Sequence, residues 1–282
     1  MTQPRVLVAD KLSPRAADIF AERGIEAVVQ TGLTPDQLKE TIADFDGLAV
    51  RSATKVTADI LEHAPRLKVV GRAGIGVDNI DVPAATAKGV VVMNTPFGNS
   101  VTTAEHAVAM MFSLARQIPA ADRSTRAGKW EKSRFMGVEV TGKVLGVVGT
   151  GKIGLCFAQI MHGFGAKLLA YDVYKTPACL ELGVTYVGLP ELLAQSDIIS
   201  LHCPLLPATH HLINDESLQH VKPGAMLVNT SRGALVNTRA VINALKSGQL
   251  GYFGSDVYEE EEALFFQDHS DRVIQDETFQ LL

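Results

Sequence analysis

The sequence predicts an α/β protein with doubly wound parallel sheets in two domains. Short apolar runs rich in valine and leucine alternate with segments of helical spacing along the chain, which is the pattern of strand-helix-strand units. The length of 282 residues suits two domains on a prior of about 150 residues each. The apolar content of 46% is sufficient for two hydrophobic cores.

Two series of strands are expected along the chain. The first series comprises residues 5–10, 26–30, 47–51, 67–72 and 90–94. The second comprises residues 144–149, 168–172, 185–188, 197–202, 225–231 and 252–257, which is enough for a complete dinucleotide-binding sheet. Between the series, proline and glycine give way to a long apolar-faced helix that begins near Ser100. We therefore expect one domain over residues 1–98 and a second over residues 99–282.

Composition narrows the class of ligand. The formal net charge is -5 and no long basic run is present, so neither nucleic acid nor an anionic membrane is favoured over a small molecule. The first ten residues lack the apolar core of a signal peptide, and the apolar run 107–115 is too short to span a membrane. We expect a cytoplasmic protein. Its three cysteines form no CxxC pair, so we expect reduced thiols, with no disulfide framework and no bound metal.

The stretch VLGVVGTGKIG, residues 144–154, carries the most specific motif. Gly149, Gly151 and Gly154 follow an expected strand and open an expected helix, which is the context that a GxGxxG match needs. The first glycine permits a tight turn, the second lets the backbone approach a pyrophosphate, and the third lets helix and strand pack closely. Lys152 and Ile153 begin the helix and are expected beside the cofactor.

An acid completes the dinucleotide pattern. Asp172 ends the next expected strand, about 20 residues after the first glycine, where a carboxylate accepts hydrogen bonds from ribose hydroxyls and repels a 2′-phosphate. NAD is therefore favoured over NADP, although Lys175 lies nearby. The alternative is that these are ordinary turn glycines followed by a solvated aspartate.

Several longer motifs resemble the NAD-dependent D-2-hydroxyacid dehydrogenases. RSATKVT (51–57), VVGRAGIGVDNID (69–81), VMNTPFGNS (92–100) and GKWEKSRFMGVEVTGK (128–143) resemble the phosphoglycerate dehydrogenase branch. From about Gly149 onward, three motifs resemble the fermentative D-lactate dehydrogenase branch: GTGKIGLCFAQIMHGFGAKLLAYDVY, NTSRGALVNT and DVYEEEEALFFQDHSDRVIQDETFQ. The resemblance thus implies a mosaic of the two branches. It also implies a flavodoxin-like substrate domain and a Rossmann domain, with an active site in the cleft between them.

Arg232 is the first candidate catalytic residue. It follows an apolar strand in NTSRGAL, where open parallel sheets place their ligands, and a guanidinium can clamp a carboxylate with two hydrogen bonds. The resemblance implies that Arg232 orients the substrate, that Glu261 hydrogen-bonds a catalytic histidine, and that Asp256 orients the nicotinamide. The run of acids around Glu261 is equally typical of a solvated loop, and Asp256 is equally typical of a turn.

The resemblance assigns further residues near the cofactor and identifies no general base. His202, Cys203, Thr230 and Ser231 match positions beside the cofactor. No residue matches the family's catalytic histidine, because His269 lies in the wrong context. Loss of a general base typically lowers the rate by about 10²- to 10⁴-fold, so the expectation is NAD binding with impaired or absent turnover.

Substrate selectivity is expected from the first half of the chain. By resemblance, the acid's carboxylate and distal phosphate are held by Arg51, Ser52, Gly74, Ile75, Gly76 and Asn99. Arg134 is the basic side chain most worth testing among six, with Arg116, Arg123, Arg126, Lys129 and Lys132. These six residues form either a basic rim for a phosphorylated acid or a solvated face.

The favoured reaction is therefore oxidation of 3-phosphoglycerate to 3-phosphohydroxypyruvate, in serine biosynthesis, with reduction of pyruvate to D-lactate as the alternative. An NAD-binding corepressor-like module and an inactive truncated module stay open. The resemblance also implies a homodimer formed through the long helix and its neighbours, and Val108, Met111, Phe112 and Ala115 form an apolar stripe consistent with this. Packing in the core explains that stripe equally well.

Overall fold

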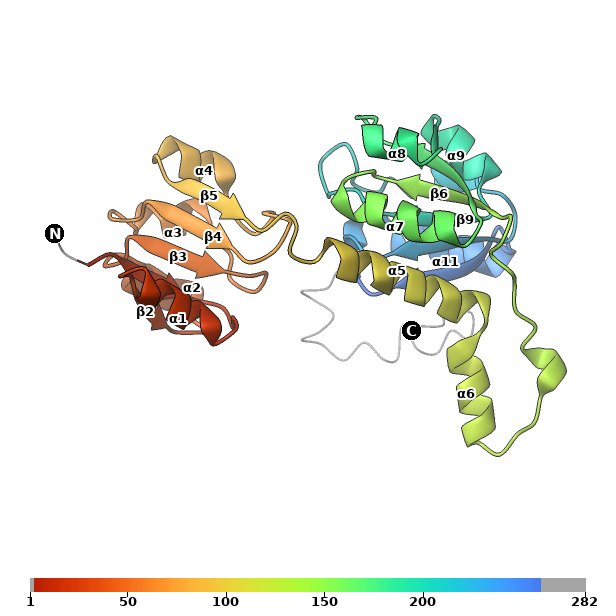
Figure 1. Ribbon diagram of the computed structural model, residues 1–282, viewed down its shortest axis with the longest axis horizontal. Helices are drawn as coiled ribbons and strands as arrows, with labels where there is room; N and C mark the ends of the chain where they lie inside the picture. The colour runs from red at the N-terminus through yellow and green to blue at the C-terminus, as the bar shows by residue number, and fades with distance from the viewer. Residues whose placement is uncertain (1–2, 260–282) are drawn as a thin grey trace. The chain divides into compact units, whose positions relative to one another are not determined.

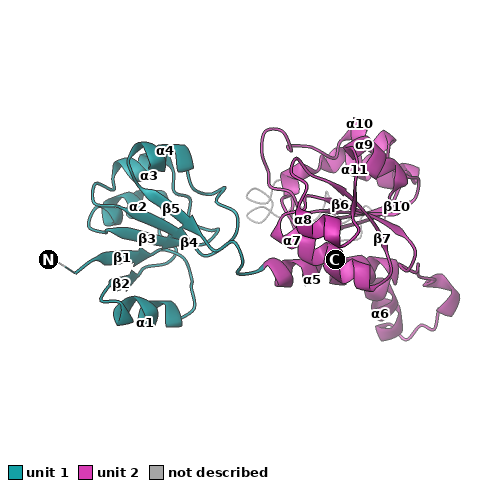
Figure 2. Cartoon of the chain, turned by 45° about the horizontal axis from the view of Figure 1, so that its top comes forward, with its two compact units in different colours: residues 1–99 teal, residues 100–282 magenta. Residues whose placement is uncertain are grey.

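The computed structural model describes residues 3–259. The chain divides into two compact units, residues 1–99 and residues 100–282, which Figure 2 shows in different colours.

Unit 1 is a parallel sheet of five strands covered by helices. The strands are β1 (Arg5–Val8), β2 (Glu26–Val29), β3 (Gly47–Val50), β4 (Val69–Arg72) and β5 (Val91–Asn94). Their order is β2-β1-β3-β4-β5, and every pairing is parallel. This is the flavodoxin-like order. All five strands predicted for this half of the chain are present.

The helices of unit 1 begin where the sequence provides caps. They are α1 (Arg15–Glu22), α2 (Pro35–Ile42), α3 (Ala58–Glu62) and α4 (Val82–Ala87). Thr34 forms a capping box with Gln37 at the start of α2, and Thr57 and Asp81 cap α3 and α4. The main core of the unit combines strand residues such as Leu7 and Leu48 with helix residues from α2, α3 and α4.

Unit 2 is a parallel sheet of six strands. They are β6 (Val144–Val148), β7 (Lys167–Tyr171), β8 (Thr185–Tyr186), β9 (Ile198–Leu201), β10 (Ala225–Asn229) and β11 (Leu250–Ser255). Their order is β11-β10-β9-β6-β7-β8, so counting from β6 gives the Rossmann order 3-2-1-4-5-6. The strand order reverses at β6, and the predicted fold class is confirmed.

Helices cover both faces of the second sheet (Figure 1). The elements are α5 (Ser100–Ala115), α6 (Ile118–Arg126), the 3-10 helix η1 (Lys132–Arg134), α7 (Lys152–Gly163), α8 (Pro177–Glu181), α9 (Leu189–Gln195), α10 (Asp215–Gln219), the 3-10 helix η2 (Gly233–Leu235) and α11 (Thr238–Ser247). On β6, Leu145 and Val147 belong to the core shared with α5 and α7, whereas Val148 belongs to the core shared with α9, α10 and α11. The alternation follows from the two-residue period of a strand.

The apolar stripe of α5 lies inside unit 2. Val108, Met111 and Ala115 are buried in the core with α7, and Phe112 packs against the same core and against Phe164. These side chains are therefore core residues. Exposed apolar side chains lie on the extension that holds α6 and η1, at Ile118, Trp130 and Met136, and at Val101 in the first turn of α5. Over residues 3–259, no helix is both long and apolar enough to cross a membrane.

Candidate functional site

The glycine turn lies where β6 meets α7. Gly149 has φ +96, and a Cβ atom there would lie 2.7 Å from the backbone nitrogen of Cys203 at the end of β9. A Cβ atom on Gly154 would overlap the carbonyl oxygen of Gly149 and lie 3.0 Å from its carbon. Only glycine fits at these two positions, because both face backbone atoms that cannot move independently of the turn.

The middle glycine faces open space. A Cβ atom built on Gly151 meets no atom within 4 Å, and Gly151 is the N-cap of α7 with exposed Lys152 and half-buried Ile153 after it. The start of this helix therefore presents backbone N–H groups at an open surface, which suits a negatively charged group. The turn fits the pyrophosphate of a dinucleotide, with a cradle that a side chain would fill.

Asp172 lies directly against this turn. Its carboxylate accepts hydrogen bonds from the backbone nitrogen of Thr150 at 2.6 Å and from the hydroxyl of Thr150 at 3.1 Å. It also accepts one from the backbone nitrogen of Tyr174 at 3.1 Å. The acid and the glycine turn thus form one unit, as the dinucleotide pattern requires.

The ends of β9 and β10 meet beside the turn. The Ser231 hydroxyl donates to the Cys203 carbonyl at 2.6 Å, and the Thr230 hydroxyl is buried with no hydrogen-bond partner among the described residues. Burial raises the pKa of the Cys203 thiol to about 11, so this cysteine is not a nucleophile at neutral pH. The unsatisfied hydroxyl is a group that a bound ligand could satisfy.

His202 is a neutral imidazole in this structure. Burial lowers its pKa to about 3. Its Nε2 atom lies 2.9 Å from the Ser200 hydroxyl, and its ring lies 4.8 Å from that of Phe157. A histidine with this pKa contributes packing and hydrogen bonds to the site and carries no positive charge at neutral pH.

Arg232 follows β10 and is half-buried. Its Nη1 atom donates to the Ser231 carbonyl at 2.7 Å. The side chain of Asn229, which is fully buried, accepts from the Ser231 nitrogen at 3.1 Å and donates to the Arg232 carbonyl at 2.9 Å. Asn229 therefore holds the turn that presents the guanidinium. The sequence analysis missed Asn229, although a polar residue closing an apolar strand is the signal that could have identified it.

The segment after β11 packs behind Arg232. A Cβ atom on Gly233 would overlap the carbonyl oxygen of Tyr258. The Glu259 carboxylate accepts from the backbone nitrogen of Thr238 at 2.8 Å and lies 2.5 Å from Nε2 of His211. Burial acts to raise the pKa of Glu259, but the hydrogen bonds from Thr238 and His211 outweigh it and lower that pKa. At least this member of the acidic run is a fixed structural residue.

Asp256 and Glu261 are the other two acids that the sequence analysis selected after β11. The Asp256 carboxylate lies 2.9 Å from Nε2 of His106 on α5, so it forms an ion pair when that histidine is protonated. Glu261 lies outside the described residues.

Unit 1 places most of its candidate residues at the carboxyl ends of its strands. Arg51 and Ser52 follow β3 and are exposed. Buried Asp10, beyond β1, accepts from the Arg51 nitrogen at 2.6 Å. Asn79, which the sequence analysis did not select, donates to the Arg51 carbonyl at 2.8 Å. These contacts hold the backbone that carries the Arg51 side chain.

The glycine loop of unit 1 follows β4. Gly74, Ile75 and Gly76 form this loop, and the Asn94 side chain at the end of β5 donates to the Ile75 carbonyl at 2.6 Å. Exposed Asn99 is the last residue of unit 1.

Arg134 lies elsewhere, in η1 of unit 2. It forms an ion pair with Glu131 at 3.3 Å, and its guanidinium lies 5.5 Å from the centre of the Phe135 ring. Arg126 pairs with Asp122 at 2.8 Å. Two of the six basic residues thus have acidic neighbours on the same extension, as in a solvated face.

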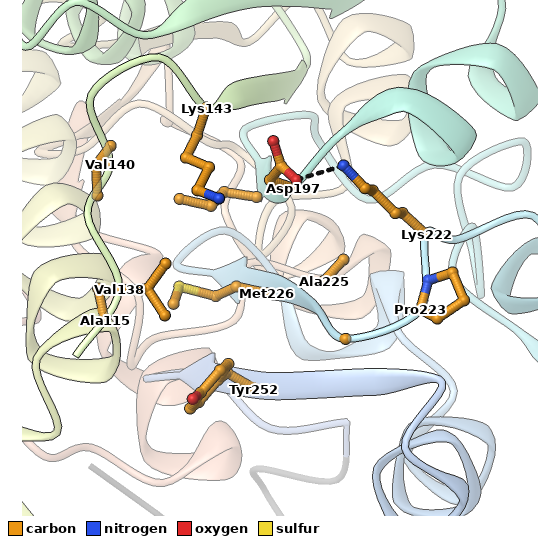
Figure 3. A pocket seen from close by; sticks show the side chains of 12 residues that line it. Ala115, Val138, Val140, Lys143, Asp197, Lys222, Pro223, Ala225, Met226 and Tyr252 are labelled. Carbon is orange, nitrogen blue, oxygen red and sulfur yellow. Dashed lines mark hydrogen bonds and ion pairs between the residues drawn. The ribbon is translucent and has the colours of Figure 1, made fainter. Parts of the chain in front are cut away.

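A pocket of about 100 Å³ lies near the starts of β9 and β10, and Figure 3 shows the side chains that line it. It is lined by apolar residues including Val140, Met226 and Tyr252, and by Lys143. An ion pair of Lys222 with Asp197, at 2.6 Å, forms part of its wall. Because Asp197 precedes β9 and the glycine turn lies at the other end of the strands, this pocket is separate from the glycine turn.

Comparisons with known proteins agree with this geometry. The family model of the D-isomer specific 2-hydroxyacid dehydrogenase, NAD binding domain, matches residues 108–277. A D-3-phosphoglycerate dehydrogenase of Synechocystis is 44% identical over 261 residues, covering 92% of this chain and 47% of that protein. The chain spans about half the length of the curated relatives it matches.

Solved structures extend the likeness to the other branch. The apo-structure of D-lactate dehydrogenase from Escherichia coli is 36% identical with a TM-score of 0.79, covering 93% of this chain and 84% of that one. D-lactate dehydrogenase from Aquifex aeolicus, complexed with NAD and lactic acid, is 30% identical with a TM-score of 0.83, covering 95% and 81%.

The predicted resemblance and the predicted cofactor, NAD, are confirmed by the family, whereas the seam near Gly149 stays a prediction. The fold, the glycine turn with its acid and these matches lead to one conclusion. The chain belongs to the D-isomer-specific 2-hydroxyacid dehydrogenases.

Proposed function

We propose that this chain is an NAD-dependent oxidoreductase of D-2-hydroxy acids, and that its substrate pair is 3-phosphoglycerate and 3-phosphohydroxypyruvate. The glycine turn with Asp172 pinned against it is the observation that carries the dehydrogenase part. The substrate part is supported by the likeness to D-3-phosphoglycerate dehydrogenase over 92% of the chain. In this proposal unit 2 binds the cofactor, and unit 1 supplies most of the residues that bind the acid.

Different residues of unit 2 bind the pyrophosphate, the ribose and the nicotinamide half of the cofactor. The N–H groups of the glycine turn and the start of α7 hold the pyrophosphate, and Asp172 accepts hydrogen bonds from the ribose hydroxyls. Thr230, Ser231 and Asp256 contact the nicotinamide half. When bound, the cofactor supplies the group that accepts or donates hydride.

The substrate is oriented by cations and by backbone. Arg232, held by the Asn229 side chain, clamps the carboxylate next to the reacting carbon. Arg51 and the loop of Gly74, Ile75 and Gly76 bind the distal phosphate. A 2-hydroxy acid carrying a second negative charge fits this set better than one whose only charge is the carboxylate. Glu261 keeps the role that the resemblance gives it, as the hydrogen-bond partner of a catalytic histidine, and the sequence analysis identifies no residue that matches that histidine.

Reduction of pyruvate to D-lactate is the second candidate. It is supported by the 36% identity to the Escherichia coli D-lactate dehydrogenase and by the motifs of unit 2 that resemble that branch. The two candidate substrates differ in the distal phosphate, which Arg51 would bind in 3-phosphohydroxypyruvate and which pyruvate lacks.

Turnover with the two acids tests the proposal. Purified chain is mixed with NADH and either 3-phosphohydroxypyruvate or pyruvate, and NADH oxidation is followed by absorbance. We expect impaired turnover, because no general base is identified, with a higher kcat/KM for the phosphorylated acid than for pyruvate. Arg232→Gln should lower kcat/KM for both acids by about 10²-fold, since it removes a bidentate charged contact.

Arg51→Gln separates the two candidates. It should raise KM for 3-phosphohydroxypyruvate at least tenfold and leave KM for pyruvate within twofold. A higher kcat/KM with pyruvate, and no change in KM on Arg51→Gln, would support reduction of pyruvate to D-lactate instead. NADH binding without turnover of either acid would instead favour a corepressor-like or inactive module.

We further propose a cytoplasmic homodimer. Cys156, Cys179 and Cys203 are free thiols, which suits a reducing compartment. The exposed Trp130 and Met136 on the extension with α6 offer an apolar surface to a second copy. Sedimentation velocity should report a dimer, and Trp130→Ala should shift the mass toward the monomer.

A further inference from the structure

Thr150 lies between two glycines of the cofactor turn and is almost completely buried, with 1% of its surface exposed. Its backbone nitrogen and its hydroxyl both donate to the same carboxylate oxygen of Asp172. Its own carbonyl accepts from the Thr176 hydroxyl at 2.8 Å. One threonine thus connects the turn, the acid after β7 and the segment that leads into α8.

Tyr186 on β8 completes a directional chain of hydrogen bonds. Its hydroxyl donates to the Thr150 hydroxyl at 2.8 Å and accepts from the Thr176 nitrogen at 3.0 Å. The Thr150 hydroxyl then has its own proton available for Asp172. The Asp172 carboxylate is the nearest acceptor for that proton, at 3.1 Å, ahead of the Thr176 hydroxyl at 3.3 Å and the Tyr174 carbonyl at 3.5 Å. Chains of hydrogen bonds such as the one from Tyr186 through Thr150 to Asp172 strengthen each bond by polarisation.

The consequence for Asp172 is a fixed orientation. Three donors, two from Thr150 and one from the Tyr174 nitrogen, hold both carboxylate oxygens. A carboxylate offers about four acceptor positions, so the side chain retains capacity for a ribose hydroxyl while its rotation is restricted. A fixed carboxylate cannot turn away from an incoming 2′-phosphate.

The same segment contains a cation that would favour the phosphorylated cofactor. Lys175 is exposed and lies three residues after Asp172. A lysine at this position can pair with a 2′-phosphate if the competing negative charge moves aside. Discrimination between the two cofactors therefore depends on how firmly Asp172 is held.

We propose that Tyr186 and Thr150 are specificity-determining positioning residues, which set the preference for NAD over NADP by locking the Asp172 carboxylate onto the glycine turn. This inference rests on the proposed binding of NAD by unit 2. It assigns a role in cofactor choice to a tyrosine on the edge strand, which the glycine-and-acid motif does not include.

Equilibrium binding of NADH and of NADPH to the full chain tests this directly, by the change in nicotinamide fluorescence. Tyr186→Phe removes only the hydroxyl that begins the chain. A lost hydrogen bond is worth about 1 kcal/mol, or roughly fivefold in an equilibrium constant. We expect the ratio of the NADPH Kd to the NADH Kd to fall about fivefold. Because both Kd values come from one preparation, any unfolded fraction cancels in the ratio.

A matched pair at position 150 provides the second measurement. Thr150→Ser keeps the hydroxyl and should keep the ratio within twofold of the unmodified chain. Thr150→Val keeps the shape, removes the hydroxyl and should lower the ratio as Tyr186→Phe does. Tyr174→Phe is the control, because the Tyr174 side chain is exposed and contacts Asp172 only through its backbone nitrogen.

Asp172→Asn shows how far the ratio of the NADPH Kd to the NADH Kd falls when the carboxylate charge is removed entirely. The proposal is overturned if Asp172→Asn lowers the ratio while Tyr186→Phe and Thr150→Val leave it within twofold. If the unmodified chain binds neither NADH nor NADPH, the proposed function is overturned, and this inference is overturned together with it.

Discussion

Two glycines of the same turn should respond in opposite ways to a single methyl group. Ala is the better helix former than Gly by about 1 kcal/mol, so Gly154→Ala, inside α7, would be stabilising on propensity alone. The structure reverses that sign. The new Cβ atom would overlap the Gly149 carbonyl oxygen and lie 3.0 Å from its carbon, and these are backbone atoms held in the turn.

The cost of this overlap sets the expected size of the effect. Overpacking of this kind typically costs about 1–3 kcal/mol. In a unit of this size each kcal/mol lowers Tm by about 2–4 °C, so Gly154→Ala should lower the Tm of unit 2 by roughly 2–12 °C. Gly151→Ala should cost less than about 1 kcal/mol, because its methyl group meets no atom within 4 Å and its backbone is extended.

For NADH affinity, in contrast to stability, Gly151→Ala should be the more damaging of the two substitutions. The methyl group of Gly151→Ala occupies the space through which backbone N–H groups reach a pyrophosphate, so NADH affinity should fall at least tenfold, or about 1.4 kcal/mol. Scanning calorimetry measures Tm, and nicotinamide fluorescence measures the Kd for NADH. The reasoning is refuted if Gly154→Ala melts within 1 °C of the unmodified chain, or if Gly151→Ala binds NADH normally.

Three further predictions concern residues around the strand ends. Burial lowers the pKa of His202 from 6.5 to about 3 in the folded chain. As pH falls, the unfolded chain therefore takes up a proton at His202 before the folded chain does. The contribution of His202 to the free energy of unfolding is present above pH 6.5 and is smaller by about 2 kcal/mol at pH 5. Urea unfolding of His202→Gln should show a smaller loss. The pKa of Glu259 is lowered from 4.5, so its contribution is present above pH 4.5 and lost as pH falls through the folded pKa. Glu259→Gln should be less stable at pH 7 and have a flatter acid limb, and equal stability at pH 7 would contradict this. Gly233→Ala should increase hydrogen exchange at residues 256–259, because its methyl group would overlap the Tyr258 carbonyl; unchanged exchange would count against that packing.

Much of the fold could be predicted because it depends on local patterns. All eleven predicted strands are present, since a buried parallel strand is a short apolar run between turn signals. The long helix that begins at Ser100 was also predicted. Its apolar stripe was consistent with either a core or a partner surface, because periodicity shows which face is apolar and leaves open what covers it. The structure resolved this in favour of the core.

The candidate site was predicted in part. The glycine turn and Asp172 could be identified because their spacing follows from the chemistry of a dinucleotide. Asn229 was missed although it closes an apolar strand. Gly233 and Tyr186 could not be identified, because each acts on a residue that is distant in the chain. Tyr186 lies 36 residues from Thr150 and 2.8 Å from it in space.

The sequence by itself therefore determined the class of fold, the place of the glycine turn and the identity of the acid beside it. Those features are encoded in the order of short segments and in single residue types. Only the tertiary structure decided that Asp172 is held by a chain of hydroxyls, that His202 is neutral and that Glu259 is fixed by His211. Hydrogen bonding and burial depend on which segments meet in space, and parallel strands bring together residues that the sequence separates by a helix and two loops.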